Sequence, residues 1–151
     1  MIAPSPDSTL FYTMESAIKG YRKFSQKRLS AVVTDMTIDQ GNILGFLAKY
    51  PEKTQQEIAA MALKDNASMT RMLDLMERKG YLTRSINKAN RRRFIIKITP
   101  KGYETLELMK PIILENRGHA LQGLSTEELT QLQYLLAKIN TNCISKPTVE
   151  V

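Results

Sequence analysis

The side chains in this sequence with most scope for chemistry are its arginines and lysines, and they are concentrated in one third of the chain. Residues 54–103 carry 11 Lys and Arg against 4 Asp and Glu, whereas residues 1–53 carry 7 against 5 and residues 104–151 carry 4 against 6. The middle segment therefore has a surplus of seven positive charges, equal to the net charge of +7 of the whole chain. Such a concentrated positive field is typical of a module that binds nucleic acid.

Few other residues could support a reaction. The chain has one histidine, one cysteine and no tryptophan, and it has no Cys/His cluster, no G-x-S-x-G motif and no Gly-rich phosphate loop. We therefore expect neither an enzyme nor a protein with a metal site or a cofactor. The histidine, His119, is expected in a loop bracketed by Gly118 and Gly123.

Two short helices are expected to position part of the basic segment. The sequence T-Q-Q-E at residues 54–57 has the form of a capping box, which predicts a helix from Gln55. Asp65 or Asn66 can cap a second helix that ends near Gly80, and the short connection predicts a helix-turn-helix. The expected buried stripe of the second helix, at spacings of three and four, is Met69, Met72, Leu73 and Met76.

The opposite face of that second helix carries small and polar side chains. They are Ala67, Thr70, Arg71, Asp74 and Arg78. In a major groove, Arg can reach guanine O6 and N7, and Thr can meet a thymine methyl group or a phosphate. An ordinary amphipathic helix with a solvated polar face has the same pattern, but the segment that follows favours DNA binding.

Two runs of strand-forming residues, 81–86 and 94–98, flank the polar basic loop 87–93 and predict a β-hairpin. A hairpin directly after a helix-turn-helix is a wing, and an arginine-rich tip can enter a minor groove. A solvated charge run on a hairpin tip is the alternative.

The motifs from Leu73 to Gly102 resemble the MarR family of bacterial transcription regulators. The resemblance rests on Lys79-Gly80-Tyr81, Arg84, Asn90-Arg91-Arg92 and Ile98-Thr99-Pro100-Lys101-Gly102, and the element order covers nearly the whole chain. It implies a single, mainly α MarR-type domain with a small β-hairpin wing: a winged helix-turn-helix at 36–100, with dimerisation helices in 1–35 and 101–151. The family usually has Asp at Asn90, where it commonly pairs with an arginine to hold the wing.

The resemblance also implies contacts with double-stranded DNA, by Ser68, Thr70 and Arg71 on the recognition helix and by Arg92 at the wing tip. The full expected set of DNA-binding residues is Ser68, Thr70, Arg71, Asp74, Arg78, Lys88, Asn90, Arg91, Arg92 and Arg93.

The helices expected at the two ends of the chain, from about Ser8 to Val33 and from Ser125 onward, carry more apolar residues than a small winged helix can cover. They could complete a monomeric core, but the family's dimeric habit favours a homodimer on a pseudo-palindromic operator, with half-sites about 10 bp apart. The expected interface residues are Phe11, Met14, Ile18, Leu132, Leu136 and Ile139.

In the family, small aromatic or phenolic acids bind between the dimer helices and the winged-helix domain and weaken DNA binding. The residues expected to line such an effector site are Tyr12, Tyr21, Arg22, Phe24, Phe46 and Tyr50. The aromatic residues among them fit an ordinary core equally well.

The sequence has no apolar run long enough for a membrane span and no signal-peptide pattern, and its one cysteine favours a reducing bacterial cytoplasm. The expected function is a sequence-specific transcriptional regulator, most often a repressor in this family, that binds an inverted repeat. A non-specific architectural winged-helix protein is one alternative. A redox-sensing regulator that acts through Cys143 is another, although the apolar stripe around Cys143 favours a small hydrophobic role.

Overall fold

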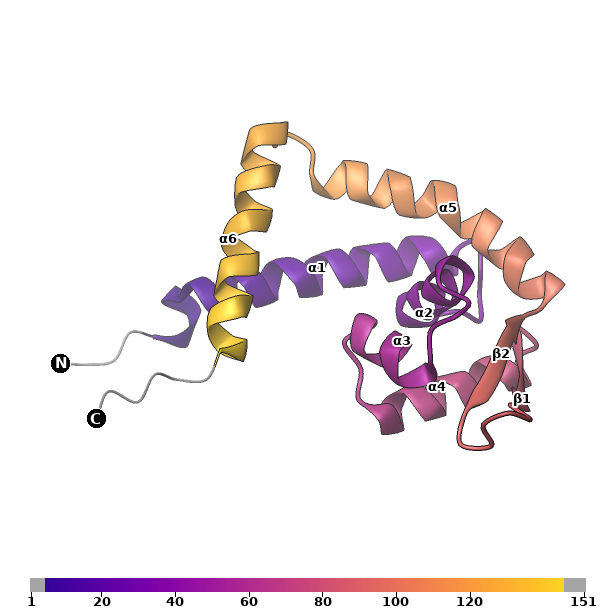
Figure 1. Cartoon of the computed structure of the whole chain (residues 1–151). Coiled ribbons are helices and arrows are strands. Elements are labelled where there is room, and N and C mark those ends of the chain that lie inside the picture. The colour runs from indigo at the N-terminus through magenta and orange to yellow at the C-terminus, as the bar shows by residue number, and fades with distance from the viewer. Residues whose placement is uncertain (1–4, 146–151) are drawn as a thin grey trace, which may run out of the picture. The chain divides into compact units, whose positions relative to one another are not determined.

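The computed structural model describes residues 5–145 and contains six α-helices and one β-hairpin in that range (Figure 1). The elements are η1 (Pro6–Ser8), α1 (Leu10–Ser30), α2 (Ile38–Lys49), α3 (Gln55–Met61), α4 (Asn66–Arg78), β1 (Leu82–Ile86), β2 (Phe94–Ile98), α5 (Pro100–Ala120) and α6 (Thr126–Ile144). The chain forms two compact units, divided after Arg117.

Local capping sets where most of the helices begin. Capping boxes open α2 at Thr37, α3 at Thr54 and α6 at Ser125, each with a Gln or Glu three residues later. Asp65 caps α4 by accepting a hydrogen bond from the backbone N–H of Ser68 at 2.7 Å. Gly80 follows α4 in the left-handed conformation, with a φ of 81°. The helix-turn-helix expected between residues 55 and 80 is confirmed.

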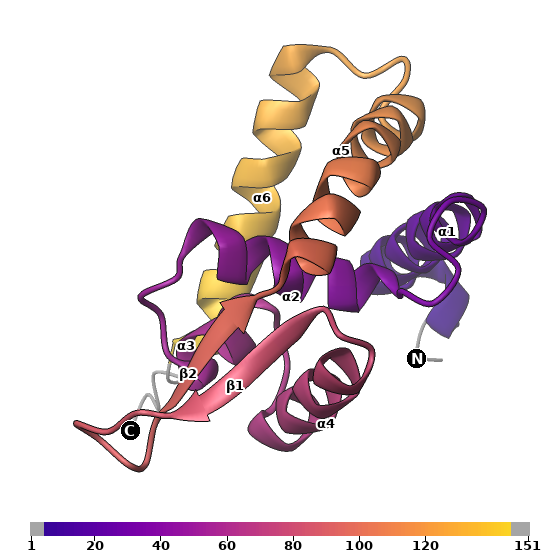
Figure 2. The same ribbon diagram turned by 90° about the vertical axis from the view of Figure 1, so that its right-hand side faces the viewer.

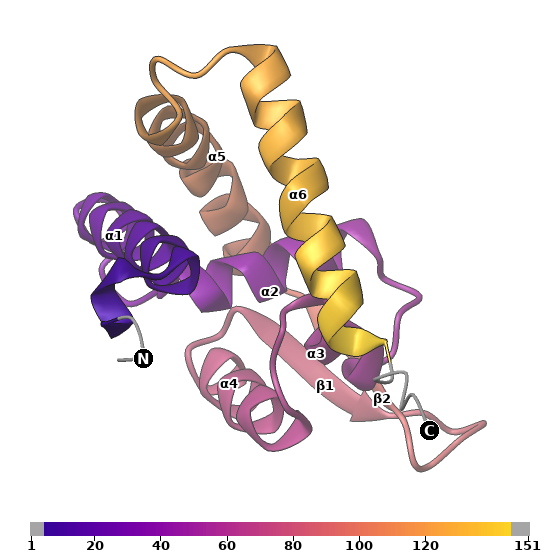
Figure 3. The same cartoon turned by 90° about the vertical axis from the view of Figure 1, so that its left-hand side faces the viewer.

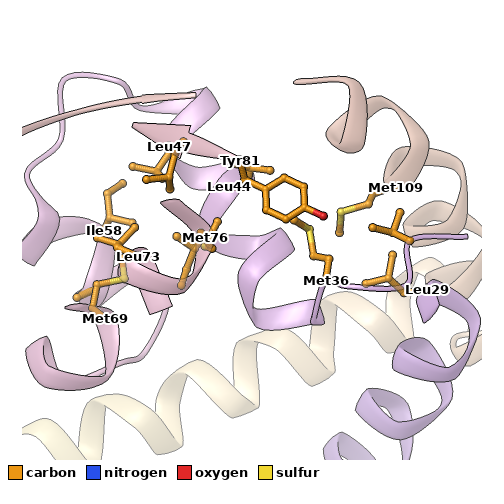
Figure 4. Packing of buried hydrophobic residues seen from close by; sticks show 14 residues of the cluster. Leu29, Met36, Leu44, Leu47, Ile58, Met69, Leu73, Met76, Tyr81 and Met109 are labelled. Carbon is orange, nitrogen blue, oxygen red and sulfur yellow. The ribbon is translucent and has the colours of Figure 1, made fainter. Parts of the chain in front are cut away.

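The core of the first unit lies between α2, α3, α4 and the hairpin (Figure 4). Met69, Leu73 and Met76 of α4 are fully buried and Met72 is partly buried, which confirms the expected stripe. The residues that bury them include Leu44, Leu47, Ile58, Tyr81 and Leu82. Leu29 of α1 and Met109 of α5 belong to the same cluster, so the two long helices are built onto the winged-helix core.

The wing is a two-stranded antiparallel hairpin in which Leu82 pairs with Ile98 and Ile86 pairs with Phe94. Figure 2 shows β1 running beside α4, while the tip of the hairpin projects away from the helices of its unit. The opposite view in Figure 3 shows the same arrangement.

The C-terminal half of α1 is hydrogen-bonded to the start of α2. The side-chain amide of Gln26 donates to the backbone oxygen of Met36 at 3.2 Å and accepts from the backbone N–H of Ile38 at 2.9 Å. Asp39, in the first turn of α2, binds Arg22 of α1 and also Lys64, at 2.7 Å, just before α4. These contacts join α1, α2 and the helix-turn-helix into one unit.

Two expected boundaries are corrected. α1 ends at Ser30 rather than near Val33, because Val32 and Val33 both donate to the backbone oxygen of Leu29 in a closing turn. The expected loop at 118–123 is shorter, because α5 continues through Gly118 and His119 to Ala120. A glycine inside a helix costs about 1 kcal/mol, which is too little to end this one.

In the second unit, α6 is a helix without buried residues, and Leu132, Tyr134, Leu135 and Leu136 are all exposed. Across residues 5–145, no helix has the length and apolar character needed to cross a membrane.

The junction between β2 and α5 depends on Gly102, which leads to a first prediction. A Cβ at this position would lie 2.3 Å from the backbone oxygen of Tyr81 and 2.5 Å from a methyl group of Ile98. Gly102→Ala should therefore lower the free energy of unfolding by about 1–3 kcal/mol in urea denaturation.

The matched control is Gly45→Ala in α2, where a Cβ meets nothing within 4 Å. It should leave stability unchanged or raise it by up to about 1 kcal/mol. Equal midpoints for Gly102→Ala and the wild type would contradict this packing.

Candidate nucleic-acid interface

The outer face of α4 presents Ala67, Thr70 and Arg71 as exposed side chains. The hydroxyl of Ser68 donates to Asp65 at 2.9 Å, and Arg71 Nη2 donates to that hydroxyl at 3.2 Å. The backbone N–H of Ser68, and then its hydroxyl, hold the pKa of the Asp65 carboxyl below its ordinary value. This short chain of contacts fixes the first turn of α4 and steadies Arg71 at its surface.

Arg84 of β1 joins the wing to α4. Its guanidinium binds Glu77 at 2.9 Å and also Asp74, and its backbone N–H donates to Glu77 at 2.9 Å. The guanidinium also lies over the ring of Phe94, 5.6 Å from the centroid. The side chain of Arg84 is only 13% exposed, so this arginine has a structural position at the base of the wing. We name these contacts the Arg84 clamp.

The tip of the wing is ordered by asparagines. The side-chain oxygen of Asn87 accepts from the backbone of Ala89 at 2.9 Å, and that of Asn90 accepts from the backbone of Arg92 at 3.1 Å. The backbone N–H of Asn87 closes the loop by donating to the oxygen of Arg93 at 3.0 Å. Asparagine commonly forms such turns. The tip is thus held by neutral groups, although the family usually has an aspartate at Asn90.

A groove of about 580 Å³ separates the start of α3 from the wing. Lys53, Gln55 and Asn66 line one side, and Arg92 and Arg93 line the wing side. Lys88 and Arg91 are exposed elsewhere on the loop. The structure therefore places expected DNA-binding residues on two elements of one unit: the outer face of α4 and the tip of the hairpin.

Several expected contact residues are already engaged by protein groups. Asp74 forms an ion pair with Arg84, and the hydroxyl of Ser68 donates to Asp65. The hydroxyl of Thr70 accepts a hydrogen bond from the side chain of Gln55 at 3.0 Å. Arg78 is exposed, and its Nε lies 3.4 Å from the backbone oxygen of Asp74. The expected site did not include Gln55, Asn87 or Arg84. The seven-residue spacing from Glu77 to Arg84 could have indicated their ion pair, whereas nothing in the sequence links Gln55 to Thr70.

The six residues expected at an effector site are spread over two helices. Tyr12 and Phe24 are twelve residues apart on α1, about 18 Å along the axis, and Tyr12 is 51% exposed. Arg22 binds Asp39. Phe46 of α2 and Tyr50, the residue directly after α2, pack against the core. Tyr21 and Phe24 are partly buried and lie one turn apart on α1.

The expected dimer residues lie on α1 and α6, and most of them are exposed in the single chain. The exposed fractions are 61% for Phe11, 52% for Ile18, 47% for Leu132 and 37% for Leu136, while Met14 and Ile139 are partly buried. Cys143 is exposed on α6. Within the described part of the chain, no three His, Cys, Asp or Glu side chains gather in a way that could hold a metal ion.

The Arg84 clamp leads to a second prediction. Arg84→Met should lower stability at neutral pH by about 1–3 kcal/mol, because it leaves two carboxylates without their shared partner. Lys110→Met, which breaks the exposed pair with Glu107, should cost less than about 0.5 kcal/mol.

The pH dependence separates the clamp from simple loss of packing. Hydrogen bonding to Arg84 lowers the folded-state pKa of Glu77 below its ordinary 4.5. The clamp therefore adds stability above about pH 4.5 and loses it as pH falls through the lowered folded-state pKa. Arg84→Met should reduce the acid-induced loss of stability between about pH 5 and pH 3. Parallel stability profiles for the variant and the wild type would argue against the clamp.

Comparison with known proteins adds independent evidence. The model of the MarR family matches residues 36–94. S. aureus MepR, in a structure with DNA, superposes with a TM-score of 0.82 at 25% identity, over 89% of this chain and 98% of MepR. Bordetella bronchiseptica BpsR, whose DNA binding is regulated by 6-hydroxynicotinic acid, has a TM-score of 0.82 at 19% identity, over 92% of this chain and 98% of BpsR.

A third structure is that of the transcriptional repressor CouR bound to a 23-mer DNA duplex. Its TM-score is 0.79 at 23% identity, over 93% of this chain and 99% of CouR. The family match covers α2, the helix-turn-helix and β1, and the shared fold extends over about nine-tenths of the chain. The chain therefore has the winged helix-turn-helix fold of these regulators, and its residues 36–94 match the MarR family.

Proposed function

We propose that this protein is a sequence-specific regulator that binds double-stranded DNA as a homodimer and represses transcription in the bacterial cytoplasm. One observation carries the proposal: Arg71 on α4 and Arg91–Arg93 at the wing tip are exposed on the unit that holds the positive surplus. In this proposal α4 enters a major groove and the wing meets the adjacent minor groove or its phosphates. The solved complexes of MepR and CouR with DNA support it.

The proposed assembly has two copies related by a two-fold axis, which would match an inverted repeat. Residues 1–35 and 101–151 would supply the dimerisation helices around the DNA-binding segment 36–100. The exposed apolar side chains of α1 and α6 support this division, because large unpaired apolar patches are uncommon on monomers.

DNA binding is tested by selecting bound sequences from a random duplex pool. We expect the wild type to recover an inverted repeat. A non-specific architectural protein would instead bind unrelated competitor DNA equally well. In that case the regulatory function would be wrong.

The two proposed DNA-contacting elements should respond differently to mutation. Arg71→Ala should cost about 1–3 kcal/mol on the selected site and should narrow the affinity gap to random DNA, because a base contact is lost. Arg92→Ala should weaken both DNAs more evenly and lower the salt slope by about one unit, because a phosphate contact is lost. Fluorescence anisotropy across a salt series measures both effects. Lys110→Ala, a charge-matched control on α5, should change neither. The DNA-binding proposal fails if the two arginine variants bind like the wild type.

The homodimer should have twice the 17.2 kDa mass of the chain in light scattering. Leu132→Glu should shift it toward monomer, because a charge would enter the proposed apolar interface. Tyr134→Glu is the control, since Tyr134 is exposed on the same helix about 200° away around its axis. A wild-type monomer at micromolar concentration would contradict the proposed assembly.

A small aromatic acid is proposed as the effector, and two buried polar atoms favour a site near Tyr21 and Phe24. Ser25 Oγ and Asn116 Oδ1 are buried without a hydrogen-bond partner. The Arg28–Glu115 ion pair, 2.7 Å long, joins α1 to α5 within one turn of both atoms. A ligand carrying both a ring and polar groups could satisfy them. BpsR, regulated by 6-hydroxynicotinic acid, supports this chemistry.

The effector proposal predicts that some member of a panel of hydroxylated aromatic acids raises the melting temperature. The same compound should weaken DNA binding by about 5- to 150-fold, the range expected for allosteric coupling. Ser25→Ala should reduce both responses without destabilising the fold, since it removes an unpartnered buried hydroxyl. If no compound changes either quantity, the effector proposal is wrong. Retention of the response in Cys143→Ser would exclude a cysteine switch as its cause.

A further inference from the structure

Thr70, on the exposed face of α4, has a hydroxyl group whose proton is already used. Its Oγ1 donates to the backbone oxygen of Asn66 at 2.9 Å and accepts from Gln55 Nε2 at 3.0 Å. A hydroxyl has one proton, so Thr70 has none left to donate to a phosphate or to a base acceptor. What it can still offer to a partner is one acceptor lone pair on the oxygen, which cannot bind a phosphate or a base acceptor, and its methyl group.

Gln55 holds this arrangement from the neighbouring helix. It is the first residue of α3 and lies 15 positions before Thr70. Threonine in a helix divides between two rotamers because its hydroxyl can bond to the preceding turn. A second hydrogen bond from Gln55 favours the rotamer in which the hydroxyl stays against the protein. The other polar atom of that amide, Oε1, is buried without a hydrogen-bond partner, which lowers the stability of the fold. Stability alone therefore does not explain a glutamine at this position.

The other hydroxyl on this part of α4 is engaged as well. Ser68 Oγ donates to Asp65 at 2.9 Å and accepts from Arg71 at 3.2 Å. Ala67 offers only a methyl group. Of these four residues, Arg71 alone keeps several donors available, since only its Nη2 contacts Ser68 and a guanidinium has five N–H groups.

We propose that Thr70 recognises the C5-methyl group of a thymine through its own methyl group, and that Gln55 is the positioning residue that sets this orientation. The inference rests on the proposed DNA binding and specifies one part of it. Under this proposal, α4 distinguishes its half-site from other sequences by a polar contact from Arg71 and by an apolar contact between Thr70 and a thymine. In this arrangement the hydroxyl of Thr70 is hydrogen-bonded within the protein, and its methyl group contacts the DNA.

The test replaces thymine by deoxyuridine, one position at a time, in the inverted repeat recovered by selection. Uracil pairs like thymine but lacks the methyl group. At one thymine per half-site, the wild type should bind the uracil-containing duplex roughly three- to five-fold more weakly for each substituted half-site, the effect of one buried methyl group. Other positions should show little change, apart from a thymine beside Ala67.

Two substitutions separate the methyl group from the hydroxyl. Thr70→Ser keeps the hydroxyl and loses the methyl group, so it should bind the thymine and uracil duplexes equally at that position. Thr70→Val keeps the original methyl group and replaces the hydroxyl by a second methyl group. It should therefore retain the preference for thymine over uracil. The ratio of the two affinities is the readout, because a general loss of folding or charge lowers both affinities together.

Gln55→Met tests the positioning role. It removes the hydrogen bond and the unpartnered oxygen, so the melting temperature should be unchanged or higher while the thymine preference falls toward one. Thr70→Val in the Gln55→Met background should restore the preference, because valine has no hydroxyl to be misplaced. Loss of stability with an unchanged preference would show that Gln55 has only a structural role and would overturn its assignment.

The outcomes also separate this inference from the proposed function. If the wild type selects no sequence, the proposed DNA-binding function fails first. The inference is wrong if no thymine of the selected site can be replaced by uracil with a loss of affinity, or if Thr70→Ser still shows that loss. In either case the regulator proposal stands.

Discussion

Tyr81 is the residue at which the elements of the DNA-binding unit meet. Its backbone N–H donates to Met76 at the end of α4, and its backbone oxygen accepts from Thr99 at the start of α5, at 3.0 and 3.1 Å. Its side chain is 1% exposed, and its hydroxyl donates to Asp35 in the segment between α1 and α2. Burial and the hydrogen bond to Asp35 raise the pKa of the phenol, so it remains a donor throughout the physiological range. α4, the wing and both long helices therefore share one fixed point.

The sequence predicted the features that depend on neighbours within four residues. Capping boxes at Thr37, Thr54 and Ser125 and the buried stripe of α4 are of this kind, and all are confirmed. Contacts between distant residues could not be predicted, since no periodicity links Gln55 to Thr70. The loop expected around His119 was wrong because a single glycine weakens a helix without ending it. The roles of the DNA-facing, effector and dimer residues stay predictions.

Gln26 ties α1 to the DNA-binding unit, in addition to the dimerisation role proposed for that helix. Its amide holds the oxygen of Met36 and the N–H of Ile38, while Arg22, one turn earlier, binds Asp39. A shift of α1 would therefore be transmitted to the first turn of α2, and from there through Lys64 to the segment that precedes α4. A ligand near Tyr21 and Phe24 would act on this rigid connection, which gives the proposed effector a mechanical route to the DNA-binding face.

The asparagine-built tip of the wing has a consequence for how the protein would behave in different media. Asn87 and Asn90 have no charge that protons or salt could alter, so the shape of the tip should be the same in dilute and concentrated electrolyte and in mild acid. A tip held by an ion pair would loosen as the electrolyte screens it. Here the ionic strength would act on the arginines as they approach a polyanion and leave the loop that carries them unchanged. The tip of the wing would thus keep one shape over a wide range of ionic strength.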